Sequence, residues 1–166
     1  MSELYKVLLA AEEAEDHVHT VERWYGSLAG VNRVAGENLT AFRVTSGNNV
    51  YGVDTQILDS ADTPILAGRV AFDLHRVLFI AASSNTVYRV QIVWGLSAAA
   101  GRAAGTYTEW MYMNDAGAAR RVPIDIRMKR VAAGTKAWAR CWNATNLATI
   151  DFFFGLHEYE QVADDD

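Results

Sequence analysis

From Leu39 to Glu160 the sequence repeats one pattern, in which a short apolar run is followed by a cluster of turn residues. Within a run such as Thr86–Trp94, apolar residues occupy every second position, which is the period of a half-buried β-strand. The interruptions, such as Ser46–Asn49, are rich in residues that favour tight turns. The pattern predicts about eight strands, at Leu39–Thr45, Val50–Leu58, Arg69–Ala82, Thr86–Trp94, Thr106–Met113, Val122–Met128, Thr135–Trp142 and Ala148–Glu160.

The apolar and aromatic content of these runs fits two sheets that fill the space between their inner faces. We therefore expect an all-β fold, an antiparallel two-sheet β-sandwich, and its strand number is that of a jelly roll. In Arg69–Ala82 the alternation changes phase at Arg76, which predicts a bulge or corner. The segments Gly26–Asn38 and Leu96–Gly105 are expected to be loops, and glycines in the latter weaken the alternative of a short helix.

The first 25 residues follow a different pattern, because apolar residues recur there at alternating spacings of three and four. This heptad spacing predicts an amphipathic helix over residues 2–25, with Gly26 after its C-terminal end. A single helix of this length is marginal in water, so we expect other protein to cover it. The predicted assembly interface of this stem consists of Leu4, Val7, Leu8, Ala11, Ala14, Val18, Val21 and Tyr25.

The predicted organisation is a helical stem or assembly arm at 1–26, a β-sandwich body at 27–162 and an acidic tail at 163–166. Because the stem needs partners, we expect a homo-oligomer, with a trimer as the first choice.

The net charge of −5 argues against nucleic acid or an anionic membrane as the main partner, because phosphate groups are bound by clustered Lys and Arg. No run approaches 18 apolar residues, so no membrane-spanning helix is expected. A single cysteine, Cys141, rules out a disulfide within the chain, and its apolar surroundings predict a small buried residue. No secretory signal is visible at the start, so no export of the chain is expected.

Three groups of residues could suggest chemistry. His17 and His19 are two residues apart and do not face each other on a helix. Asp73 with His75, and His157 with Tyr159, share strand faces, but no nucleophile motif, zinc motif or phosphate loop accompanies them. We expect no enzymatic activity, no metal and no cofactor. Asp73, His75 and Arg76 are interpreted as hydrogen-bonded contacts at a sheet edge or subunit boundary.

Trp138, Arg140 and Trp142 alternate with small residues and so share one face of a predicted strand. Three interpretations remain open. The tryptophans could lie in the core, with Arg140 paired to a carboxylate such as Asp151. They could form a subunit interface, or a platform that stacks sugar rings.

Five stretches together resemble uncharacterised structural proteins of tailed phages: His19–Gly26, Phe72–Arg76, Pro123–Met128, Lys136–Trp142 and Asp151–Tyr159. The resemblance implies a virion protein, a capsid decoration (cement) protein of jelly-roll type that acts as a trimer. Its expected partners are copies of itself and the major capsid protein or another virion protein. The alternative is a fibre or receptor-binding head domain that recognises a host glycan.

Overall fold

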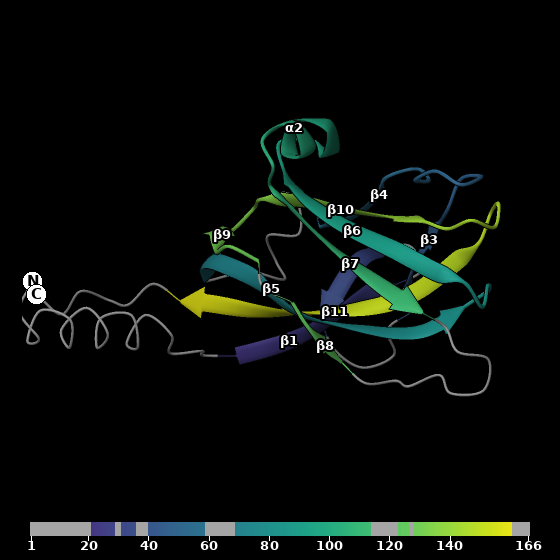
Figure 1. Cartoon of the computed structure of the whole chain (residues 1–166). Coiled ribbons are helices and arrows are strands. Elements are labelled where there is room, and N and C mark those ends of the chain that lie inside the picture. The colour runs from purple at the N-terminus through teal and green to yellow at the C-terminus, as the bar shows by residue number, and fades with distance from the viewer. Residues whose placement is uncertain are drawn as a thin grey trace, which may run out of the picture.

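The structure is a computed structural model that describes residues 21–28, 31–35, 40–58, 69–113, 123–126 and 128–160. In this part of the chain the fold consists of two antiparallel β-sheets and a six-residue helix. Figure 1 shows the sheets as two layers, with the helix at one end of the smaller layer. The expected all-β, two-sheet class is confirmed.

The larger sheet has seven strands, and its central strand is β11 (Thr149–Glu160). One edge of β11 pairs with β5 (Arg69–Ala82) over nearly its whole length. The other edge pairs first with β3 (Phe42–Thr45) and then with β1 (Val21–Leu28). The sheet is completed by β2 (Val31–Ala35) beside β1, and by β8 (Ile124–Asp125) and β9 (Val131–Ala132) beside β5.

The smaller sheet has four strands, in the order β4 (Thr55–Leu58), β10 (Lys136–Trp142), β6 (Val87–Gly95) and β7 (Tyr107–Met113). Helix α2 (Ala98–Ala103) lies between β6 and β7 in the sequence. The segment 96–105, which we expected to be a loop, therefore contains a short helix.

The core lies between the two sheets and is rich in aromatic residues. On β11 the side chains of Phe152, Phe154 and Leu156 are fully buried. Phe79 of the larger sheet packs on Tyr112 of the smaller one, with ring centroids 4.5 Å apart. Cys141 also faces this core, as predicted, and burial raises the pKa of its thiol to about 12.

The predicted change of phase in β5 is confirmed. Arg76 lies opposite Gly155 and Leu74 lies opposite Leu156, so His75 is an extra residue in the pairing of the two strands. This bulge moves the inward-facing positions from Leu74 to Val77, and it explains why a single alternation does not fit the whole strand.

The prediction that the helical stem extends to residue 25 is wrong. Val21–Leu28 is not the last turn of a helix but strand β1, in which Val21 lies opposite Glu158 and Tyr25 opposite Phe154. The predicted boundary at residue 26 therefore cuts through a strand. The expected loop 26–38 is also partly wrong, because β2 forms a second strand within it. The stem residues Leu4 to Val18, the pair His17 and His19, and the tail 163–166 lie outside the described residues.

A buried carboxylate explains why β1 is a strand. Glu158 is completely buried, and the hydroxyl group of Tyr25 donates a hydrogen bond to it. Arg69 donates from Nε at 3.1 Å, and Arg23 Nε lies 3.8 Å away. Burial, and then the neighbouring carboxylate, raise the pKa of Tyr25, which keeps its phenol protonated as a donor. The ring of Tyr25 also stacks on Phe154.

Two other expected strands are shorter than predicted. In the segment 50–58 only β4 is a strand, and it is preceded by an isolated bridge between Tyr51 and Trp142. In the segment 122–128 the described residues form only the two-residue strand β8. Pro123 cannot donate a backbone hydrogen bond, which limits pairing there.

We predict that Glu158→Ala lowers the free energy of unfolding by about 3 kcal/mol, because it removes the carboxylate around which buried donors are arranged. Tyr25→Phe should cost about 1.5 kcal/mol through the loss of one hydrogen bond to a charged group. Urea unfolding followed by circular dichroism measures both effects. The control is Asp125→Ala, because Asp125 is 74% exposed and its pairing with the partly exposed Arg76 should matter little. A Glu158→Ala variant as stable as the control would contradict this role.

Candidate functional site on the outer face of the smaller sheet

The outer face of the smaller sheet follows from the alternation in β10. Ala137, Ala139 and Cys141 face the core and are buried, whereas Trp138, Arg140 and Trp142 point outward and are half-buried. The interpretation that the tryptophans lie in the core is therefore wrong. The core side carries the small residues because the aromatic side chains of the larger sheet fill the space opposite them.

Strand register places these three residues in rows across β10, β6 and β7. Neighbours in a row lie directly opposite each other, so their side chains are in contact distance on the same face. The rows are Trp142–Arg89–Met111, Arg140–Gln91–Glu109 and Trp138–Val93–Tyr107.

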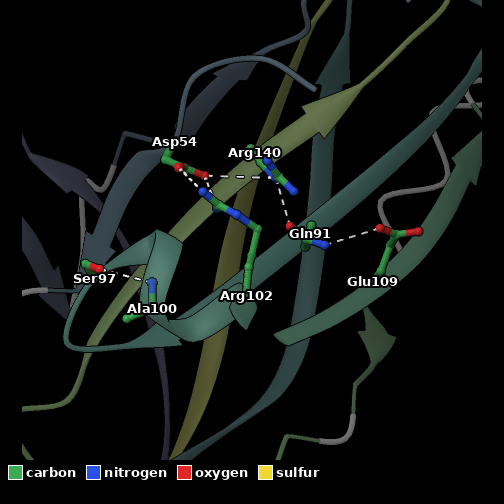
Figure 2. Close-up of polar contacts among 7 residues, drawn as sticks. All are labelled: Asp54, Gln91, Ser97, Ala100, Arg102, Glu109 and Arg140. Atoms are coloured by element: carbon green, nitrogen blue, oxygen red, sulfur yellow. Dashed lines mark hydrogen bonds and ion pairs between the residues drawn. The ribbon is translucent and has the colours of Figure 1, made fainter. Parts of the chain in front are cut away.

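The middle row is a chain of hydrogen bonds, which Figure 2 shows. Arg140 Nε donates to Gln91 Oε1 at 2.8 Å, and Gln91 Nε2 donates to Glu109 Oε2 at 3.4 Å. Tyr51, from the segment before β4, reaches over the same row, and its hydroxyl group donates to Glu109. Arg140 does not pair with Asp151, as one interpretation had it, because Asp151 binds Arg43 through both carboxylate oxygens at 2.7 Å.

Two arginines of this face stack on aromatic rings. The guanidinium carbon of Arg140 lies 4.2 Å from the ring centroid of Tyr51, and that of Arg89 lies 5.2 Å from the ring centroid of Trp142. Such cation–π contacts hold a planar cation flat on the surface. Burial, and then the charge of Arg102, lower the pKa of Arg140. The face is therefore a rigid layer of aromatic and charged groups.

Helix α2 covers one end of this face. The hydroxyl oxygen of Ser97 accepts from the backbone N–H of Ala100 at 3.1 Å and so caps the helix. Gly101 lies against β6 so closely that a Cβ atom would come within 2.6 Å of the carbonyl oxygen of Trp94. Arg102 then binds both carboxylate oxygens of Asp54, at 2.8 and 2.9 Å, which joins the helix to the segment before β4 (Figure 2).

A shallow depression of about 490 Å³ lies beside the face, and Tyr51 belongs to both. Its lining includes Val53 and Leu147, which are 84% and 68% exposed. Exposed aliphatic groups next to a layer of aromatic rings are suited to contact with another molecule.

The larger sheet brings together the two sequence pairs that could have suggested catalysis. His157 Nδ1 lies 3.4 Å from Asp73, and Tyr159 donates from its hydroxyl group to Asp73 at 2.7 Å. The rings of His75 and His157 are in contact, with centroids 3.8 Å apart. Arg130 lies over the ring of Tyr159. These contacts link β5 to β11, two interior strands of the larger sheet, so they do not lie at a sheet edge as one interpretation had it.

Among the described residues, no group of three or more His, Cys, Asp or Glu side chains is arranged to hold a metal ion. No helix in this part of the chain has the length and apolar character needed to cross a membrane.

Sequence reasoning identified the β10 residues of the face but missed Tyr51, Asp54, Gln91, Arg102 and Glu109. Gln91 and Glu109 occupy outward positions of predicted strands, so correct pairing of the strands would have found them. Tyr51, Asp54 and Arg102 come from a loop and a short helix, and no local pattern marks them.

Comparison with models of protein families, with curated proteins and with solved structures finds no match for this chain.

We predict that Asp54 and Arg102 are coupled by about 1 kcal/mol, because the pair is bidentate and about three-quarters buried. A double-mutant cycle with Asp54→Ala and Arg102→Ala, measured by urea unfolding, gives this energy. The matched control is the pair Arg76 and Asp125, in which the side chains are 38% and 74% exposed. Equal coupling in the two cycles would contradict a special role for the α2 contact.

Proposed function

We propose that the sandwich is a jelly roll, which forms when a long antiparallel ribbon of strands rolls up. The support is a nested order of antiparallel pairs from β3 to β11. Leaving out β9, the first strand pairs with the last (β3 with β11), and the second with the last but one (β4 with β10). The next pair is β5 with β8, and the innermost is β6 with β7.

Two further contacts support this topology. Where the ribbon rolls over itself, β11 pairs with β5 in the larger sheet and β10 pairs with β6 in the smaller one. Strands β1 and β2 extend the larger sheet beyond the ribbon. Viral capsid proteins and lectins use this architecture.

We infer that the chain is a structural protein of a virion, a capsid decoration (cement) protein that stabilises a phage head as a homo-oligomer. The nested strand pairing is the observation that carries this proposal, and it acts by analogy, because one fold hosts many functions. The resemblance of five stretches to tailed-phage structural proteins agrees with it. The rigid aromatic and charged face of the smaller sheet is suited to protein contact and holds no constellation typical of an enzyme.

In this proposal residues 1–20 act as the arm that attaches to the major capsid protein or to another virion protein. The apolar residues Leu4, Val7, Leu8 and Ala11 would supply the binding energy by burial. The arm must be defined as ending before β1, because Val21–Tyr25 belongs to the larger sheet.

We predict that the chain occurs in purified phage particles in a fixed ratio to the shell protein, and that shells lacking it bind the added protein. Deletion of residues 1–20 should abolish binding and leave the β circular dichroism spectrum unchanged. Deletion of residues 1–25 is the contrasting variant, since it also removes the part of β1 that pairs with β11 and should destabilise the fold. Absence of the chain from particles, or normal binding after deletion of 1–20, would contradict the proposal.

One observation favours a second function, a receptor-binding head that holds a glycan. Trp138 and Trp142 do point outward, and flat aromatic faces stack on sugar rings. A glycan array with the full chain tests this, and Trp138→Ala should remove any signal. The control is Val70→Ala, which removes an exposed apolar side chain from β5 of the larger sheet and should have no effect. An array without signal excludes this function.

A further inference from the structure

We propose that two copies of this chain join through strand β7, antiparallel and about a two-fold axis at Trp110, so that the two smaller sheets become one. This inference goes beyond the proposed function and does not depend on it. Strand β7 pairs with β6 on one edge, and no other described strand pairs with it. The open edge is therefore a template for another strand.

The hydrogen bonds between β6 and β7 determine which backbone groups of β7 point to the open edge. The N–H of Trp94 donates to the carbonyl oxygen of Thr106 at 3.0 Å, in register with the pairing of β6 and β7. In an antiparallel pair, hydrogen-bonded positions alternate with positions whose groups point away. Thr108, Trp110 and Tyr112 therefore bond to β6. The backbone groups that point to the open edge belong to Tyr107, Glu109, Met111 and Met113.

Among the described residues, this edge carries one protective charge, that of Glu109, and lacks the other features by which proteins protect edge strands. Strand β7 is seven residues long, contains no Pro, Lys or Arg, and pairs with β6 without a bulge. Its outward side chains Tyr107, Met111 and Met113 are 44%, 71% and 64% exposed. Exposed apolar side chains along an open, regular edge are what a strand-to-strand contact would cover.

One register suits a second copy best. With Trp110 on the axis, Tyr107 lies opposite Met113 of the second copy, and Glu109 lies opposite Met111 of the second copy. All four outward-pointing residues then meet outward-pointing residues, which gives about eight backbone hydrogen bonds, two for each facing pair. Tyrosine against methionine is also a favourable contact, because the thioether packs on aromatic rings.

The charge of the Glu109 carboxylate favours the same register. A shift that centres the axis on Glu109 would place two carboxylates directly opposite each other, which is unfavourable. With the axis at Trp110, the row Arg89–Met111 of one copy continues into Glu109 of the second copy. The carboxylate of one copy thus lies on the same face as the arginine of the other, and Tyr51 and Gln91 hold it in place.

Sedimentation equilibrium of the full chain from about 1 to 200 µM tests the proposal, and we expect a reversible monomer–dimer equilibrium. Met111→Glu places a second carboxylate directly opposite Glu109 of the other copy and should raise the dissociation constant at least about tenfold. The control Leu147→Glu changes an equally exposed apolar residue outside β7 and should leave the equilibrium unchanged. Circular dichroism verifies that each variant is folded. A monomer throughout the range, a trimer, or a dimer insensitive to Met111→Glu would overturn the proposal.

The register has its own test. Glu109→Cys and Met111→Cys variants are prepared separately, mixed and oxidised, and Cys141 stays buried in both. We expect disulfide-linked heterodimers in the mixture and little cross-linking of either variant alone, because residue 109 of one copy faces residue 111 of the other and neither residue faces itself. Cross-linking of Glu109→Cys to itself, or none in the mixture, would overturn the two-fold axis at Trp110.

Discussion

The structure depends on the pairing of β11 along both of its edges. Strand β5 accompanies it on one side, and β3 and β1 divide the other side between them, so three distant parts of the chain meet on one strand. Its inward side chains Phe152, Phe154 and Leu156 fill the core. At its C-terminal end a buried carboxylate, Glu158, requires the phenol of Tyr25 and the guanidinium of Arg69 as partners. Because a buried charge without partners is costly, this contact places β1 in the sheet.

The two sheets differ in what they present outward. The larger sheet links Asp73, His157 and Tyr159 by contacts within itself. The smaller sheet presents aromatic rings, stacked arginines and an open strand edge, and α2 is joined to it through Arg102 and Asp54. Rigid groups that lose little entropy on contact are suited to binding. The proposed contact between two copies therefore lies in the smaller sheet, at the open edge of β7, apart from the attachment proposed for residues 1–20.

Much of the fold could be predicted from local patterns. The alternation of β10 predicted which residues share a face, and the phase change in β5 predicted its bulge, because both follow from the period of a strand. Which face of β10 points outward was left open by the sequence, because it depends on the aromatic side chains that fill the core opposite it. The nature of β1 could not be predicted. Its apolar residues also fit helical spacing, and the partner that decides, Glu158, lies 133 residues away from Tyr25. The polar network of the candidate site was missed for the same reason, because Asp54 and Arg102 meet only in the folded chain.

Hydrogen exchange of the backbone amides, followed residue by residue by NMR, tests most directly whether β1 is a strand of the larger sheet. Because β1 pairs with β11, we expect slow exchange at alternate amides of Val21–Tyr25, at rates close to those of the paired segment of β11. Helical chemical shifts over these residues, or fast exchange at all of their amides, would contradict it.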